Sequence, residues 1–140
     1  MNTSLYQQEL LRHASDASSA GEIEEPDCTA TIDNPLCGDR IKVDLNMEDG
    51  KVTRYAHDTR ACVLCQASAA MIGHMIVGKD ADTFEQGEAA VTALLKENAS
   101  EPAPPFKEFK IFSSVAAHQS RHQCVLLPFE AVREALNQED

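Results

Sequence analysis

Apolar and polar residues alternate with a period of two through much of the region between residues 28 and 58, the pattern of half-buried β-strands. The alternation is clearest over 40–47, where every second side chain is apolar. The inward positions there are Ile41, Val43, Leu45 and Met47, and the outward positions are Lys42, Asp44 and Asn46. Residues 28–33 form the preceding strand, and residues 51–58 return after the turn residues Glu48-Asp49-Gly50. Strands in this order predict an antiparallel meander over 28–60.

A helical period replaces the alternation on both sides of this meander. Upstream, residues 4–14 predict a helix in which Ser4 and Gln7 have the spacing of a capping box, and the polar residues 15–27 predict a surface loop. Downstream, apolar residues recur at helical spacing from residue 63. These residues are Cys65, Ala69, Ile72 and Ile76. We expect Gly78 to lie just past the end of that helix.

Two further helices are predicted in the C-terminal half. Thr83 is expected to cap the first of them, which must end before the proline-rich residues 99–105. Residues 106–123 predict a short helix and a turn. Apolar residues at helical spacing then mark the last helix, namely Val125, Phe129, Val132 and Leu136. Pro128 is expected in its first turn, where the missing N–H costs little.

The whole chain, residues 1–140, is expected to form one α+β domain. Within this domain we predict a helical arm over 1–20, the β-meander over 28–60 and a helical part over 62–140. A chain of this length buries enough surface to form a core without disulfides or a structural metal.

The charge balance argues against several classes of partner. The 12 Lys and Arg residues against 23 Asp and Glu give a formal charge of −11, which disfavours nucleic acid and anionic membranes. No apolar run approaches the ~18–20 residues of a membrane span, and the N-terminal residues lack the regions of a signal peptide. We therefore expect a cytoplasmic protein whose five cysteines serve a metal or catalysis rather than disulfides.

Three cysteines lie beside polar residues at the boundaries of predicted elements. Cys37 lies with Asp39 in the tight loop 34–39. Cys62 falls at the start of the helix from residue 63, where the helix dipole favours a thiolate, and Cys124 falls at the start of the last helix. Three thiolates and a carboxylate form a four-ligand set suited to zinc or an iron–sulfur cluster, with Asp as the weaker, more exchangeable ligand.

An arginine lies within three residues of each of these thiols, and a nearby cation also favours the thiolate. The three residues are Arg40, Arg60 and Arg121.

Two other interpretations of the cysteines stay open. Cys62-Val63-Leu64-Cys65 is a C-x-x-C motif at a helix start, as in thiol–disulfide oxidoreductases. Cys65, however, falls on the apolar stripe of its helix, and Cys28 on the apolar face of its strand, which favours two small core residues. The other interpretation is an interaction domain with a purely structural zinc.

Three segments resemble the cysteine segments of the IscU/NifU N-terminal family of iron–sulfur cluster assembly proteins. They are NPLCGDRI (34–41), ACVLCQASAAMI (61–72) and SRHQCVLLPFEAV (120–132), and the resemblance extends over roughly residues 5–138. It implies an α+β fold with a small, antiparallel three-stranded sheet and helices on one side and at both ends. It also implies that the metal or cluster ligands are Cys37, Asp39, Cys62 and Cys124.

Within that family the chain is more similar to the SufU branch than to the IscU branch. Gln123 rather than His precedes the third cysteine, no LPPVK segment lies upstream, and Arg121 precedes Cys124 by three residues. This resemblance implies a Zn²⁺ site, a transient [2Fe–2S] cluster or iron, and a scaffold or sulfur carrier rather than a stand-alone enzyme. Cys37 would accept sulfur from a cysteine desulfurase with Arg121 in support, whereas the IscU branch points to Cys124.

The partners that the resemblance implies are a cysteine desulfurase and, downstream, apo iron–sulfur proteins or carriers. His118 and His122 lie near the third cysteine and are candidates to compete as ligands, although a lone histidine is more often hydrogen-bonded or exposed.

Overall fold

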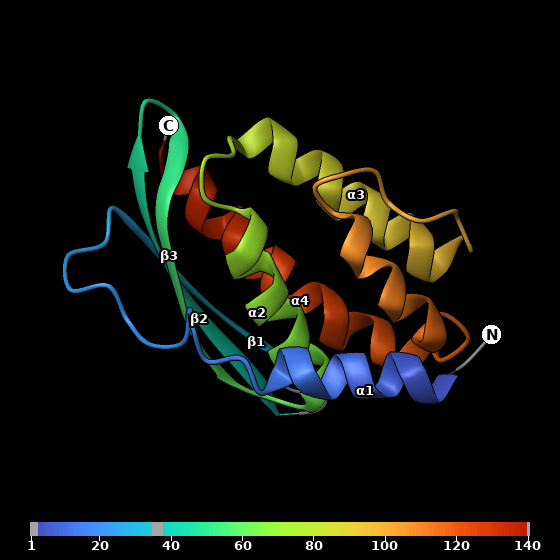
Figure 1. Ribbon diagram of the computed structural model, residues 1–140. Coiled ribbons are helices and arrows are strands. Elements are labelled where there is room, and N and C mark those ends of the chain that lie inside the picture. Colours follow the sequence, from blue (N-terminus) through green and yellow to red (C-terminus); the bar gives the residue numbers. More distant parts are fainter. Residues whose placement is uncertain (1–2, 35–37, 140) are drawn as a thin grey trace.

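The structure, a computed structural model, describes residues 3–34 and 38–139, with residues 3–6 and 139 described by their backbone alone (Figure 1). The elements are α1 (Thr3–Ala14), β1 (Cys28–Asn34), β2 (Asp39–Glu48), β3 (Lys51–Arg60), α2 (Val63–Met75), α3 (Ala81–Lys96), the 3₁₀ helix η1 (Lys107–Val115), α4 (Gln119–Leu136) and the short 3₁₀ helix η2 (Asn137–Glu139). The described strands form one three-stranded antiparallel sheet in the order β1-β2-β3, with helices on one side of it (Figure 1). The α+β prediction is confirmed.

The β2–β3 hairpin follows from its turn residues and its apolar face. Asp49 and Gly50 have φ of 55° and 77°, the positive values that a tight two-residue hairpin turn requires. The predicted inward residues Ile41, Val43 and Leu45 are fully buried, as the alternation requires. A register shift between Asn46 and Met47 marks a β-bulge, which increases the local twist of the sheet.

Asp44 corrects one detail of the predicted strand. It lies on the outward face, yet only 2 % of its surface is exposed, because the loop over 15–27 covers it. The N–H of Ile23 donates to Asp44 Oδ2 at 3.1 Å, and the Thr29 hydroxyl donates to Oδ1 at 2.7 Å. Ile23 is itself buried, so this loop is not purely a surface loop.

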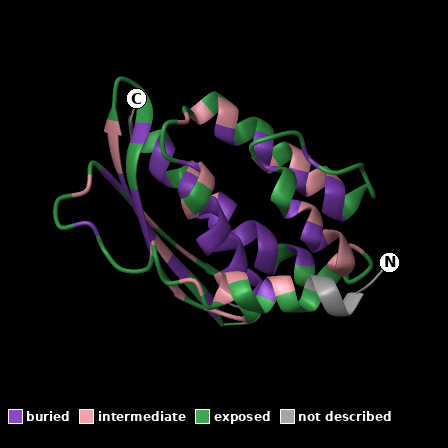
Figure 2. Ribbon diagram, viewed as in Figure 1, coloured by how far each residue is buried: buried purple, intermediate pink, exposed green. Residues whose placement is uncertain are grey.

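α2 is the central helix of the fold, since its residues from Leu64 to Ile72 are nearly all buried (Figure 2). It packs between β3, α1 and α4. Its last helical residue is Met75 and its C-cap is Ile76, so Gly78, with φ of 88°, lies two residues beyond the cap. The prediction for this helix is confirmed, with its end shifted by one residue relative to the expected position of the glycine.

The start of α3 differs from the prediction. Asp80, not Thr83, is the N-cap: its carboxylate accepts a hydrogen bond from the Thr83 N–H at 2.8 Å. Aspartate is among the preferred N-cap residues, and the side chain of residue 80 reaches the N–H three positions on. The helix ends at Lys96, before the proline-rich segment, as predicted.

The start of α4 also corrects the sequence prediction. The helix begins at Gln119, so Pro128 lies in its interior and not in its first turn. The expected short helix in 106–123 is η1, but residues from 119 onward join α4. Cys124 therefore lies in the second turn of the helix. Proline has no N–H, so the helical ladder lacks the bond from residue 128 to the Cys124 carbonyl.

Among the helices of the described residues, none has both the length and the apolar character needed to cross a membrane.

Candidate metal centre

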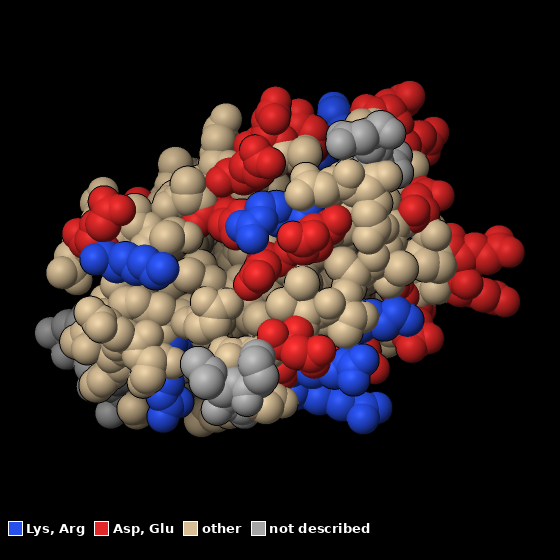
Figure 3. Space-filling view, turned by 180° about the vertical axis from the view of Figure 1, so that it is seen from behind, with Lys and Arg blue, Asp and Glu red and all other residues tan. Residues whose placement is uncertain are grey.

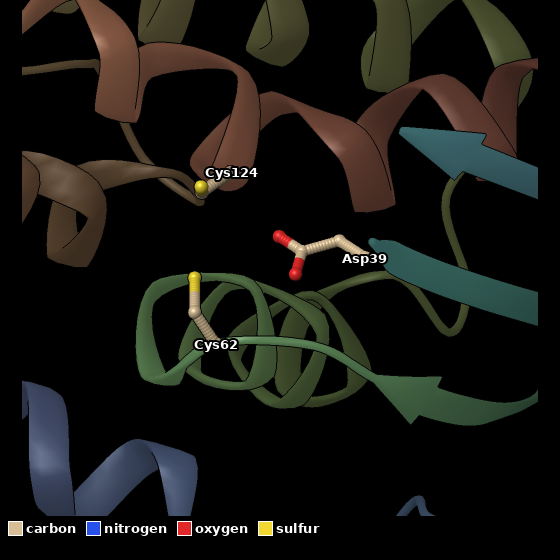
Figure 4. Close-up of side chains that lie close together, drawn as sticks. All are labelled: Asp39, Cys62 and Cys124. Atoms are coloured by element: carbon tan, nitrogen blue, oxygen red, sulfur yellow. The ribbon is translucent and has the colours of Figure 1, made fainter. Parts of the chain in front are cut away.

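Three predicted site residues from distant parts of the chain lie together at one end of the sheet (Figure 4). Asp39 is the first residue of β2, Cys62 is the N-cap of α2, and Cys124 lies on α4. The two sulfurs and a carboxylate oxygen lie within 4.8 Å of one another. Asp39 and Cys124 are buried, whereas Cys62 is partly exposed, so the site opens to solvent on the Cys62 side. Cys37 lies outside the described residues.

Strand pairing brings Asp39 and Cys62 together. Arg40 pairs directly with Arg60 across β2 and β3, so the start of one strand lies beside the end of the other. The Gln66 side chain donates to the Thr59 carbonyl at 2.8 Å and holds the first turn of α2 against the end of β3. Cys62 then follows β3 after a single residue.

Cys62 is the N-cap residue that begins α2. Its backbone is extended, with φ of −67° and ψ of 170°, and its side chain makes no capping hydrogen bond. The first turn of α2 contains no acidic residue. The Cys62 side chain therefore lies at the positive end of the α2 dipole, beside the N–H groups of the first turn.

Asp39 carries the clearest sign that the site fits a cation. Its Oδ2 atom is buried and has no hydrogen-bond partner among the residues that the structure describes. A buried carboxylate oxygen without a partner is costly, and a positive ion between it and two thiolates would satisfy it. Sulfur-rich donor sets with one carboxylate suit zinc and iron.

The histidines near Cys124 do not belong to this group. His122 is buried, and its Nε2 lies 2.8 Å from the Ala116 carbonyl oxygen, to which it donates. His118 is the exposed N-cap of α4. His122 is therefore a hydrogen-bonded histidine and His118 an exposed one, as is usual for a lone histidine.

Cys65 and Cys28 lie in the core. Cys65 is 0 % exposed and Cys28 is 2 % exposed, and neither forms a disulfide. The neighbouring Tyr55 is buried, and this burial, together with Cys65, raises the pKa of its hydroxyl. Cys65 belongs to the core and not to the group formed by Asp39, Cys62 and Cys124, which favours the interpretation of Cys65 as a small core residue.

The arginines occupy two different surfaces. Successive strand residues point to opposite faces, so Arg40 and its cross-strand neighbour Arg60 lie on the face of the sheet away from Asp39. There they line a cavity with Lys42 and Asp58, and Arg40 pairs with Asp33 at 3.6 Å. In the view from behind, Lys and Arg side chains gather with acidic ones toward one edge (Figure 3).

Arg121 instead lines a groove that includes Val63, the residue after Cys62. This groove, of about 620 Å³, also contains Leu11, and Leu11 and Val63 are 55 % and 44 % exposed. The sequence predictions missed it. The one available signal was the Leu10-Leu11 pair, because adjacent leucines cannot both face the core from one helix.

Residues 5–138 match the family described as the NifU-like N-terminal domain. The chain belongs to this family. It is 27 % identical over 133 residues to the iron–sulfur cluster assembly scaffold protein IscU of Thermotoga maritima, covering 94 % of this chain and 92 % of that protein. It is 21 % identical to the zinc-dependent sulfurtransferase SufU of Bacillus subtilis, covering 97 % and 92 %.

Among solved structures, a nitrogen-fixing NifU-like protein (N-terminal) from Brucella abortus superimposes with a TM-score of 0.90. It is 36 % identical, and the match covers 95 % of this chain and 92 % of that one. The family expected from the three cysteine segments is confirmed, and so is the fold that the resemblance implied.

Proposed function

We propose that this NifU-like protein acts in iron–sulfur cluster assembly. It accepts sulfur from a cysteine desulfurase, assembles a nascent [2Fe–2S] cluster on the same residues, or does both. The observation that carries this proposal is the convergence of Asp39, Cys62 and Cys124 from three elements onto one cation-sized site. The names of the IscU and SufU relatives support it.

The proposed ligand set is Cys37, Asp39, Cys62 and Cys124, and Zn²⁺ is the resident ion in the SufU-like interpretation. Bound zinc would keep the thiols deprotonated and shield them from oxidation. Asp39 is the single oxygen donor in this set and the weaker ligand for such an ion, so it is the ligand that exchanges most readily. Cys62, partly exposed at the positive end of α2, faces an arriving partner.

Sulfur transfer follows as a thiol-exchange step. The Cys37 thiolate attacks the terminal sulfur of the persulfide on the desulfurase. The bond between that sulfur and the desulfurase cysteine breaks, the desulfurase leaves as a thiolate that takes up a proton, and the sulfur remains on Cys37. Arg121 borders the groove that includes Val63, the residue after Cys62, and stabilises the anionic sulfur during approach. Sulfur or cluster then passes to an apo iron–sulfur protein or carrier.

Mass spectrometry after incubation with a cysteine desulfurase and cysteine tests this proposal, with metal analysis of the purified protein beforehand. We expect zinc or iron in the protein and a persulfide that is lost in Cys37→Ser and kept in Cys28→Ser, the matched core control. Loss of thiol–disulfide exchange activity in Cys65→Ser would favour the redox interpretation. Unfolding on chelation, with no persulfide on any cysteine, would favour a structural zinc and contradict the proposal.

A second arm of the experiment tests cluster assembly. Anaerobic addition of iron with the desulfurase and cysteine should produce the visible absorption of a [2Fe–2S] cluster. Asp39→Ala should change how long that cluster or the zinc is retained, because the weak ligand is missing. If Asp39→Ala matched the wild type in metal content, cluster retention and sulfur acceptance, the role given to Asp39 would be wrong.

A further inference from the structure

A buried side-chain hydrogen bond joins the helix of Cys62 to the helix of Cys124. The Ser68 hydroxyl on α2 donates to the Val125 carbonyl on α4 at 2.8 Å, across 57 residues of sequence. Ser68 is 0 % exposed, so no water competes for this bond. Its acceptor is the carbonyl directly after Cys124. The bond therefore acts at the point where α4 carries its sulfur.

The surroundings of Ser68 show that the two helices approach closely here. The short Ser68 side chain reaches the Val125 carbonyl at 2.8 Å, so the two backbones are near each other, and the sequence neighbours Ala67, Ala69 and Ala70 are small and buried. A serine in a helix commonly bonds to the carbonyl four residues before it, but Ser68 reaches across to α4 instead. Replacing the hydroxyl would leave the packing of small side chains almost unchanged and remove only the link.

α4 needs such a link at this turn more than elsewhere. Pro128 lies four residues after Cys124 and has no N–H, so the helical ladder loses its bond to the Cys124 carbonyl. The turn from Cys124 to Pro128 is consequently held by fewer internal bonds than the rest of the helix. Ser68 supplies an external bond to the same turn.

The other side-chain bonds that fix α2 do not reach α4. Gln66 donates to the Thr59 carbonyl, and the Tyr55 hydroxyl donates to the Ala69 carbonyl at 2.8 Å, so both tie α2 to β3. These bonds hold Cys62 relative to Asp39. Of these three bonds, the Ser68 bond is the one that joins α2 to α4.

We propose that Ser68 is a positioning residue: its hydroxyl sets the separation of the Cys62 and Cys124 sulfurs by tying α2 to α4 beside the site. The geometric claim stands without a bound metal. Its consequence for sulfur or cluster chemistry rests on the proposed function. Without the bond, α4 moves relative to α2 at its least supported turn, and the two sulfurs spend less time within reach of a common partner atom.

The rate at which an oxidant joins the two sulfurs reports how often they come within bonding distance of each other. In a metal-free background with Cys37 and Cys65 replaced by alanine, diamide takes two electrons and two protons from Cys62 and Cys124 and leaves a disulfide. Peptide mapping identifies this cross-link. We expect Ser68→Ala to slow its formation about tenfold, because small displacements strongly reduce the rate of a reaction between positioned groups.

Tyr55→Phe is the matched control, since it also removes one buried hydroxyl bond to an α2 carbonyl. It should lower the urea midpoint about as much as Ser68→Ala does and leave the cross-linking rate within about twofold of the wild type. Equal rates in Ser68→Ala and the wild type, or equal slowing in both variants, would overturn the proposal.

A second pair of variants covers the case in which Ser68→Ala does not fold. Ser68→Thr and Ser68→Val have the same shape and differ only in the hydroxyl. The threonine variant should cross-link about tenfold faster than the valine variant, and equal rates would contradict the role of the hydroxyl. None of these rates requires a desulfurase or a metal, so a failure of the proposed function leaves this test intact.

Discussion

The two sides of the site are held in place by different kinds of structure. Asp39 begins β2, and Cys62 lies two residues past the end of the adjacent strand β3. Backbone pairing of these strands fixes both positions, and Gln66 adds a bond to the end of β3. Cys124 lies on α4, which contacts α2 by packing and through the Ser68 bond. The sheet side is therefore fixed by many backbone bonds, and the helix side by side chains. A partner that exchanges a ligand or receives a cluster would find the helix side easier to displace.

Removing packing from α4 should give the largest effect. Phe129 is fully buried, and its ring lies 5.2 Å from Phe109 and 5.4 Å from Phe84, centroid to centroid. Phe129→Ala should lower the free energy of unfolding by about 3–5 kcal/mol, measured by urea denaturation. Because this packing supports the helix of Cys124, the variant should also slow the Cys62–Cys124 cross-link.

Leu45→Ala is the matched control on the sheet side. Leu45 is fully buried in β2, and its loss should cost about 2–5 kcal/mol. Backbone pairing should keep Asp39 and Cys62 in place, so the cross-linking rate should stay close to that of the wild type. If both variants slowed the cross-link equally, the two sides of the site would not differ in the way described above.

Asp44→Ala should have the next largest effect on the free energy of unfolding, and this effect should be limited to the sheet side of the site. The substitution leaves the Ile23 N–H and the Thr29 hydroxyl without their acceptor, which should cost about 1–3 kcal/mol in urea denaturation. Asp58→Ala, an exposed carboxylate on the same strand pair, should change stability by less than about 0.5 kcal/mol. A cross-linking rate that fell in Asp44→Ala would contradict the separation of the two sides.

The same contrast explains which parts of the fold could be predicted from the sequence alone. The meander was predictable because each strand reports its inward face through a period of two and because Asp49-Gly50 has turn chemistry of its own. Asp44 was mispredicted because the alternation describes a strand and not the loop that later covers it. The start of α4 was mispredicted because Pro128 was assumed to mark a first turn, whereas the helix begins at Gln119 and contains the proline in its interior.

The site residues divide in the same way. Asp39, Cys62 and Cys124 could be selected from the sequence because thiols and a carboxylate at element boundaries are unusual for core residues. Their convergence depends on contacts that bring Cys124 to the other two residues across more than 60 residues of sequence, which no local pattern contains. Ser68 was invisible for this reason: in the sequence it is a small residue between alanines, and only the position of α4 gives its hydroxyl a function.

Pro128→Ala should act on the helix side in the opposite direction. Alanine restores the missing backbone bond and removes a penalty of about 3 kcal/mol for an interior proline, while the lost ring packing offsets part of this gain. We expect a net stabilisation of about 1 kcal/mol in urea denaturation. With the turn now internally bonded, Ser68→Ala should slow the cross-link less in this background than in the wild type. An unchanged effect of Ser68→Ala would show that the proline does not weaken the helix beside Cys124.

The smallest effect concerns pH and belongs to the sheet side. His57 on β3 is buried, and this burial lowers its pKa below the ordinary value of 6.5, although Asp58 and Asp16 oppose the shift. The unfolded chain therefore binds a proton at a higher pH than the folded one, so stability is complete above pH 6.5 and is lost as the pH falls toward the folded pKa. The thermal midpoint should fall over this range in the wild type and less in His57→Gln. Because His57 contacts the loop over 15–27 through backbone bonds to Ser19 and Gly21, the loss should appear there first, as faster amide exchange, and leave the Cys124 turn unchanged.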